Sequence, residues 1–120
     1  MAHEVARALN VRALFAKRYA GVLTLRRGFA IRPLERVLVV EDVVTNGGSA
    51  VEGAELVRSF GGEVVGFATI VERGDVPQLS PLCSSWQVRP LVFSEADCPL
   101  CSQGIPLSKP GSRPMQPTTK

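Results

Sequence analysis

The spacing of apolar residues predicts one short helix and two strands in the first part of the chain. Residues 4–9 have apolar positions at near-helical spacing, and the pattern stops at Asn10, a residue that tolerates the conformation of a helix C-cap. Residues 11–16 are typical of a short buried strand, and a polar segment with a glycine follows at 17–21. Residues 23–26 alternate apolar and polar positions, which predicts a half-buried strand.

The strongest pattern lies between residues 37 and 71. The uninterrupted β-branched and aliphatic run at 37–40 is typical of a strand that is buried on both faces of a parallel sheet. A loop is expected at 41–49 and a helix at 50–60, ended by two glycines, and a second buried strand is expected at 64–71. The residues expected on the inner side of the helix at 50–60 are Val51, Ala54, Leu56 and Val57. Strand, loop, helix and strand form a β-α-β unit with a right-handed crossover, so the chain is predicted to have an α/β fold.

Prolines at positions 77, 81, 90 and 99 interrupt the remainder of the chain. They leave room for one short strand near residues 88–93. Pro, Ser, Lys, Gly and Thr dominate from residue 106, so a mobile tail is expected at 108–120. We expect residues 1–95 to form the folded part and residues 96–120 a tail with cysteines and prolines.

The composition limits the classes of function. A chain of 120 residues with 45% apolar and 21% charged residues predicts one globular domain with a modest core. The net charge of +3 is a mild excess spread along the chain, so no nucleic-acid partner is expected. No apolar stretch is long enough for a membrane span, and the first residues lack the core of a signal peptide. Three cysteines without a secretion signal favour a reducing compartment, so a cytoplasmic location without membrane association is predicted.

The candidate chemistry follows the apolar run at 37–40. Glu41 and Asp42 are expected at the carboxyl edge of the sheet, where such folds bind ligands. Two carboxylates there can accept hydrogen bonds from vicinal sugar hydroxyls and help to bind Mg²⁺. The small residues at 45–49 let backbone N–H groups surround an anion at the start of a helix. A generic turn would explain the glycines, but two charges at the end of a buried strand are costly without a ligand.

The segment Val37-Leu-Val-Val-Glu-Asp-Val-Val-Thr-Asn-Gly-Gly-Ser49 resembles the strand, acidic pair and phosphate loop of type I phosphoribosyltransferases. The resemblance implies the parallel-sheet core of that family and Mg²⁺ as cofactor. It also implies that the loop binds 5-phosphoribosyl diphosphate. The residues that it implies for this ligand are Glu41, Asp42, Val43, Val44, Thr45, Asn46, Gly47, Gly48 and Ser49.

Further stretches resemble the orotate phosphoribosyltransferases within that family. They are residues 11–18, 25–29, 71–73, 98–101 and 109–113. The resemblance implies that Thr45 and Arg73 contact orotate, although a solvated surface arginine remains the alternative for Arg73. It implies that Lys17 and Arg18 lie over the departing diphosphate, with a flexible basic turn as the alternative. Related enzymes use a lysine further along this loop, and residues 19–22 contain none, so Arg26 and Arg27 are candidate substitutes.

The implied reaction transfers ribose 5-phosphate from 5-phosphoribosyl diphosphate to orotate in a homodimer. The family's domain has a further N-terminal portion, so this chain is expected to be N-terminally incomplete and to expose an apolar sheet edge. Three alternatives remain: a purine phosphoribosyltransferase, a regulator with the same fold, and a non-catalytic remnant. The first of these is weakened because residues 71–76 contain no aromatic side chain to stack on a base. No metal site is expected at Cys98 and Cys101, because a complete site needs four ligands at recognisable spacing.

Overall fold

The computed structural model describes residues 1–26, 28–94 and 96–105. The chain divides into two compact units, Met1–Pro90 and Leu91–Lys120. Arg27, the motif at 109–113 and the mobile tail expected at 108–120 lie outside the described residues. The division expected after residue 95 stays a prediction.

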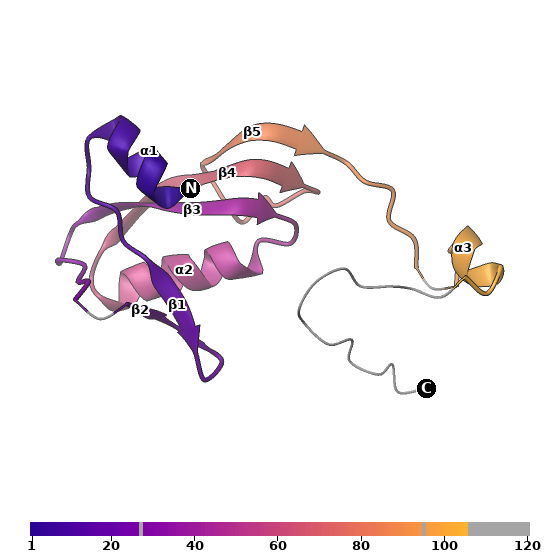
Figure 1. Ribbon diagram of the computed structural model, residues 1–120, viewed down its shortest axis with the longest axis horizontal. Coiled ribbons are helices and arrows are strands. Elements are labelled where there is room, and N and C mark those ends of the chain that lie inside the picture. Colours follow the sequence, from indigo (N-terminus) through magenta and orange to yellow (C-terminus); the bar gives the residue numbers. More distant parts are fainter. Residues whose placement is uncertain (27, 95, 106–120) are drawn as a thin grey trace. The chain divides into compact units, whose positions relative to one another are not determined.

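The first unit contains two helices and five strands in the part of the chain that the structure describes (Figure 1). In order they are α1 (Ala2–Leu9), β1 (Ala16–Tyr19), β2 (Val22–Leu25), β3 (Arg36–Val44), α2 (Gly48–Ser59), β4 (Glu63–Arg73) and β5 (Leu82–Val88). The second unit contains the short helix α3 (Pro99–Ser102). The C-cap residue of α1 is Asn10, with a φ of 54°, as the sequence predicted.

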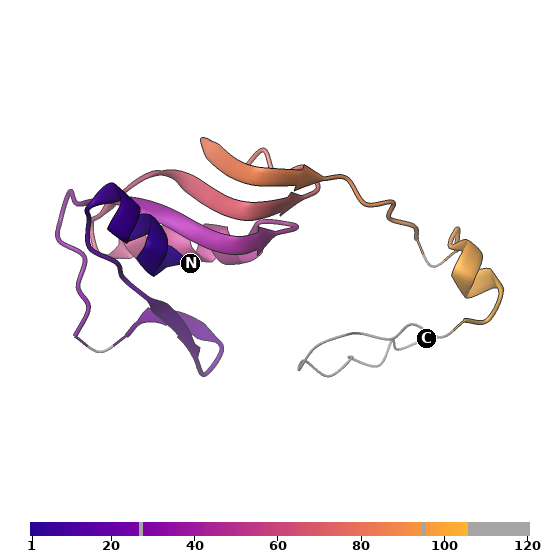
Figure 2. The same ribbon diagram turned by 45° about the horizontal axis from the view of Figure 1, so that its top comes forward.

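A parallel sheet of β3, β4 and β5, in that order, forms the centre of the first unit. In its register Val39 lies opposite Phe67, and Val44 lies opposite Glu72. Figure 2 shows α1 in front of β3, whereas α2 lies behind the sheet. The parallel pairing of β3 with β4, joined through α2, confirms the predicted α/β fold class.

Small residues on α2 bring this helix close to the sheet. Ala50, Ala54 and Val57 are buried, and Val51 and Leu56 are half-buried. Ala50 and Ala54, with Val51 packed beside them, share a core with Val44, Phe67, Val76 and Leu79. The side of the helix predicted to face the core is therefore confirmed. Ala54, the smallest of its predicted residues, is only 1% exposed.

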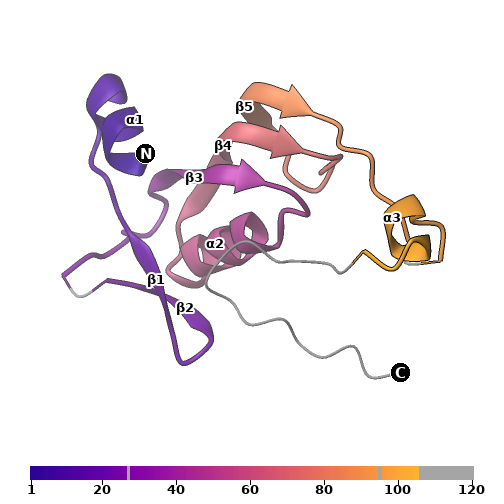
Figure 3. The same ribbon diagram turned by 45° about the vertical axis from the view of Figure 1, so that its right-hand side comes forward.

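The predicted strand at residues 11–16 is wrong. Residues 11–15 are irregular, and an antiparallel hairpin of β1 and β2 begins at Ala16, in the segment expected to be a polar loop (Figure 3). All four residues of β1 are exposed, so no burial pattern marks this strand. Its turn is made by Ala20 and Gly21, both at positive φ, the geometry that joins two-residue hairpins.

The strand predicted near residues 88–93 is also wrong, because β5 ends at Val88. Its pairing with β4 begins where Leu82 lies opposite Phe67. The sequence of β5 alternates only weakly, and Trp86 is 64% exposed. Whether such a segment forms a strand depends more on the strand with which it pairs than on its own apolar pattern.

Candidate functional site

The candidate loop follows the carboxyl end of β3, at the arrowhead end of this strand in Figure 1. β3 continues through Val44, further than the sequence suggested, and α2 begins at Gly48. The loop is therefore Thr45–Gly47, with Gly48 and Ser49 in the first turn of the helix. Gly47 is the N-cap at a φ of 75°, a conformation that glycine adopts without steric cost. This arrangement places the N–H groups of the helix start shortly after the strand.

The acidic pair lies on the last part of β3. Glu41 is half-buried and Asp42 is exposed. Burial, and then the negative charge of Asp42, raise the pKa of the Glu41 carboxyl above its ordinary value. Asp42 Oδ1 accepts a hydrogen bond of 2.8 Å from the N–H of Val43, and the hydroxyl of Thr69 lies 3.1 Å from the carbonyl oxygen of Asp42. The two carboxylates thus repel each other, and a ligand that donates hydrogen bonds or carries positive charge would reduce this repulsion.

A cation at this pair would need additional ligands. Among residues 1–26, 28–94 and 96–105, no group of three or more His, Cys, Asp and Glu side chains is arranged to hold a metal ion. Mg²⁺ is commonly held by one or two carboxylates together with phosphate oxygens of a substrate and water. Glu41 and Asp42 fit this second arrangement, in which the ligand brings most of the oxygens.

Residues that the sequence analysis did not select hold the loop in shape. The side-chain amide of Gln78 donates a hydrogen bond of 2.8 Å to the carbonyl oxygen of Asn46. Asn46 Oδ1 in turn accepts a bond of 3.3 Å from the N–H of Gly48. A Cβ added at Gly74 would lie 3.3 Å from the carbonyl oxygen of Thr45. The contact from Gln78 spans 32 positions, so no local pattern in the sequence could have indicated it.

Thr45 and Arg73 each come directly after the last paired residues of β3 and β4. Val44 is opposite Glu72 in the parallel register, and each of the two site residues comes directly after one of these. Both are exposed. Arg73 makes no hydrogen bond or ion pair through its side chain in the described part of the chain. The guanidinium of Arg73 is therefore available to a ligand at the carboxyl edge of the sheet.

The buried carboxylate next to Arg73 is neutralised by other residues. Glu72 accepts hydrogen bonds of 2.9 Å from both Ser84 and Gln87, and Arg89 contacts it at 3.2 Å. The Ser84 hydroxyl, followed by Gln87 and Arg89, lowers the pKa of Glu72. All three partners belong to β5 or follow it directly, so Glu72 does not need Arg73 as its counter-ion.

Lys17 and Arg18 lie on β1, in the hairpin, and not in an irregular loop. Arg18 forms an ion pair with Glu52 of α2 and donates a hydrogen bond of 2.7 Å to the carbonyl oxygen of Gly21. Lys17 is exposed. No hydrogen bond or ion pair joins either side chain to the acidic pair among the described residues. Their predicted role over the diphosphate stays a prediction.

The second unit holds two of the three cysteines. Cys98, the N-cap residue of α3, and Cys101, within this helix, are half-buried and form no disulfide. Hydrogen bonds from Cys101 and from the backbone of Leu100 lower the pKa of Cys98. No metal-binding group includes them in the described residues, and no described helix has the length and apolar character required to span a membrane.

Known proteins resemble this chain in both sequence and fold. The family model described as the phosphoribosyl transferase domain matches residues 3–89. The chain is 56% identical over 115 residues to a protein named orotate phosphoribosyltransferase from Caldanaerobacter subterraneus subsp. tengcongensis, covering 94% of this chain and 60% of the relative. A protein of the same name from Thermotoga maritima is 49% identical, with 94% of this chain and 62% of the relative covered. The chain thus spans about three fifths of the length of these relatives.

A solved structure supports the fold. The crystal structure of adenine phosphoribosyltransferase from Thermoanaerobacter pseudethanolicus matches with a TM-score of 0.54 at 20% identity, covering 71% of this chain and 61% of that chain. At this identity the similarity concerns the fold alone. The match of the family model to most of the chain, together with the β-α-β unit that carries the acidic pair and the glycine loop, shows that the chain belongs to the phosphoribosyl transferase domain family.

Proposed function

We propose that this chain carries the substrate-binding core of an orotate phosphoribosyltransferase, which forms orotidine 5′-monophosphate from orotate and 5-phosphoribosyl diphosphate. The observation that carries the proposal is that Thr45 and Arg73 directly follow the last paired residues of β3 and β4, at the strand ends that also carry the acidic pair. The names of the relatives, which are about half identical to this chain, support orotate as the base.

In this proposal the loop and the acidic pair hold the ribose phosphate. The N–H groups at the start of α2 bind the 5-phosphate, because they lie at the positive end of the helix dipole, and the N–H of Gly48 exchanges Asn46 Oδ1 for a phosphate oxygen. Glu41 and Asp42 accept hydrogen bonds from the vicinal ribose hydroxyls. Binding favours the ionised form of Glu41, so its raised pKa predicts tighter binding as the pH rises through that pKa.

The base is held from the neighbouring strand. The planar guanidinium of Arg73 can pair with the carboxylate of orotate through two parallel hydrogen bonds. The hydroxyl of Thr45 can bond to a carbonyl oxygen of the base. Since Glu72 is satisfied from β5, the positive charge of Arg73 is not reduced by its neighbour.

The transfer breaks the bond between C1 of the ribose and the diphosphate oxygen, and it forms a bond from C1 to N1 of orotate, whose N1 proton is released to the departing diphosphate or to water. The departing diphosphate keeps the electron pair of the broken bond, and positive charge develops on the ribose. Glu41 and Asp42 stabilise that positive charge electrostatically. Mg²⁺, when bound, neutralises the negative charge of the diphosphate. Arg18 would have to leave Glu52 to assist, whereas Lys17 has no ion-pair partner in the described residues.

A ligand-binding unit without catalytic activity is the second candidate. It is favoured by the fraction of the relatives that the chain spans, about three fifths of their length. We also propose a homodimer and a cytoplasmic location, in keeping with the metabolic enzyme for which the relatives are named.

Calorimetric titration of the folded chain with 5-phosphoribosyl diphosphate and Mg²⁺ tests the binding site. Asp42→Asn should weaken binding about tenfold or more, because it removes a charged acceptor of hydrogen bonds. Asn46→Thr is the matched control and should change the Kd by less than about threefold, since both side chains can cap a turn. No binding by a folded sample, or equal small effects of both substitutions, would contradict the assigned roles.

Conversion of orotate, followed by the change in its ultraviolet absorbance, separates the two candidates. Binding of the diphosphate without product favours the non-catalytic unit. If product forms, Arg73→Ala should raise the KM for orotate at least tenfold and leave the affinity for 5-phosphoribosyl diphosphate nearly unchanged. A similar loss of affinity for both ligands would refute the specific role of Arg73.

A further inference from the structure

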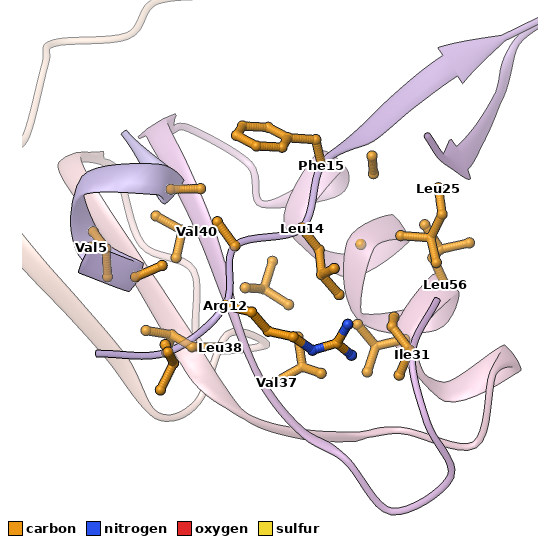
Figure 4. A pocket seen from close by; sticks show the side chains of 18 of the residues that line it. Val5, Arg12, Leu14, Phe15, Leu25, Ile31, Val37, Leu38, Val40 and Leu56 are labelled. Carbon is orange, nitrogen blue, oxygen red and sulfur yellow. The ribbon is translucent and has the colours of Figure 1, made fainter. Parts of the chain in front are cut away.

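Two of the three cysteines lie close together in the sequence of the second unit. Cys98 and Cys101 belong to Leu91–Lys120, whereas Cys83 lies on β5 of the first unit. Among the described residues no cysteine lines the open groove of about 750 Å³ beside β3, around which Figure 4 shows mostly apolar side chains of α1, β3 and α2. The pair of cysteines is therefore a separate feature, which the proposed function does not use.

The two cysteines belong to one helical turn that is fixed at both ends. Pro99 occupies the first helical position, where its restricted φ favours the helix. The N–H of Ser102 donates a hydrogen bond of 3.0 Å to the carbonyl oxygen of Cys98, so the turn includes this cysteine. At the other end Gly104 has a φ of 70°, and its N–H donates a hydrogen bond of 3.0 Å to the carbonyl oxygen of Cys101, as in a glycine C-cap.

This turn keeps the two thiols near each other and favours ionisation of one of them. Cα atoms three positions apart on an α-helix are separated by about 5 Å, and a disulfide requires roughly 4.4–6.8 Å. The N–H and the thiol of Cys101, and then the N–H of Leu100, act as hydrogen-bond donors to Cys98 and lower the pKa of its thiol. A lowered pKa increases the fraction of thiolate, which is the nucleophilic form. Of the two residues, Cys98 thus has the surroundings of an attacking thiol.

We propose that Cys98 and Cys101 form a thiol–disulfide exchange site for low-molecular-weight disulfides, in which the pair is converted reversibly to an intramolecular disulfide. First, the Cys98 thiolate attacks one sulfur of the small disulfide, whose S–S bond breaks and whose other half leaves as a thiolate. Then the sulfur of Cys101 attacks Cys98 Sγ, breaks the mixed disulfide and releases the second half. The small disulfide gains two electrons from the protein and, directly or through water, the two protons of the protein thiols, so it leaves as two thiols.

A metal ion would need ligands in addition to this pair. Structural Zn²⁺ usually has four ligands, and in residues 1–26, 28–94 and 96–105 no group of three or more His, Cys, Asp and Glu side chains is arranged to hold a metal ion. A disulfide requires only the two thiols that the turn supplies. Both are half-buried and not fully enclosed, so a small disulfide can reach them. The exchange involves neither orotate nor 5-phosphoribosyl diphosphate, so its test is independent of the proposed function.

The probe is glutathione disulfide, added to the reduced full chain with Cys83→Ser, which removes the exposed third thiol. Mass spectrometry should find a chain that has lost two hydrogens and carries no glutathione, and dithiothreitol should restore both thiols. Adding Cys101→Ser should stop the reaction at a mixed disulfide on Cys98. Adding Cys98→Ser instead, as the matched variant, should slow the reaction about tenfold, because the hydrogen-bond donors that favour the thiolate act on Cys98.

The reaction in urea gives a second readout. Unfolding the turn should abolish the difference in rate between the two single-cysteine variants, since the donors no longer surround Cys98. Equal rates of these variants in the folded chain, or a difference that persists in urea, would overturn the role of the turn. A mixed disulfide that persists beside Cys101, a disulfide between two chains, or Zn²⁺ in the purified chain that blocks the reaction until a chelator removes it would overturn the exchange site.

Discussion

Gly47 is the residue at which the conformation of the loop can be tested most directly. It is the N-cap of α2 and has a φ of 75°, a region that L-residues with a Cβ rarely adopt. A Cβ at this position would lie 2.7 Å from Nε2 of Gln78 and 3.2 Å from Cδ1 of Leu79. Gly47→Ala therefore adds backbone strain and a steric conflict at the point where residues 74–79 support the loop.

The cost follows from three contributions. A left-handed conformation costs a residue with a Cβ about 1–2 kcal/mol. The amide of Gln78 must move away and lose its bond to Asn46, which costs about 1 kcal/mol. Leu79 is only 2% exposed and must shift by a few tenths of an ångström within the core. Gly47→Ala should thus lower the free energy of unfolding by about 2–3 kcal/mol.

Urea denaturation followed by far-ultraviolet circular dichroism measures this change. Gly48→Ala is the matched control, because its φ is not positive and its Cβ would meet only Asn46 Oδ1, at 3.6 Å. Its stability should stay within about 0.5 kcal/mol of the wild type, with a small gain from helix propensity. Equal effects of the two substitutions, or a loss below about 0.5 kcal/mol for Gly47→Ala, would refute the strained-cap reasoning.

Two further predictions concern pH. The raised pKa of Glu41 means that its contribution to stability is fully present below the unfolded pKa and is lost as the pH rises through the folded pKa. Asp42→Asn should lower the pKa of Glu41, measured by carboxyl NMR titration, and reduce that loss; an unchanged pKa would show that burial alone sets it. The lowered pKa of Glu72 has the opposite sign, because its contribution is present above the unfolded pKa and is lost as the pH falls through the folded pKa. Glu72→Gln should therefore flatten the decline of the urea midpoint in acid, and a variant with the wild-type decline would rule out this role.

The β-α-β unit and the candidate loop could be predicted from the sequence because their signals are local. The apolar run at 37–40, the adjacent carboxylates and the two glycines of the loop each constrain the backbone over a few residues. These signals predicted a parallel strand, a turn at its carboxyl end and a helix start, and the structure has all three. The end of the strand was predicted too early, because the loop was expected to begin at Glu41 and β3 extends through Val44. A strand ends where its ladder ends, and the partner β4 continues to Arg73.

By contrast, the two wrong strands depended on neighbours that the sequence does not specify. Residues 11–15 have the apolar composition of a strand, but they belong to no ladder with a described strand. β5 has a poor apolar pattern, yet it pairs along β4 and supplies the partners of Glu72. Pairing is a property of two segments, so composition alone cannot decide it.

The sequence by itself determined the fold class, the family of the loop and the acidic pair at the edge of the sheet, because periodicity and turn chemistry act within a few residues. Only the tertiary structure decided that Gln78 holds the loop, that Thr45 and Arg73 follow the paired residues Val44 and Glu72, that Arg18 pairs with Glu52 and that β3 borders an open groove. The Gln78, Arg18 and β3–β4 contacts each join segments that are more than 25 positions apart. Such contacts are set by register and packing, which no local pattern of residues encodes.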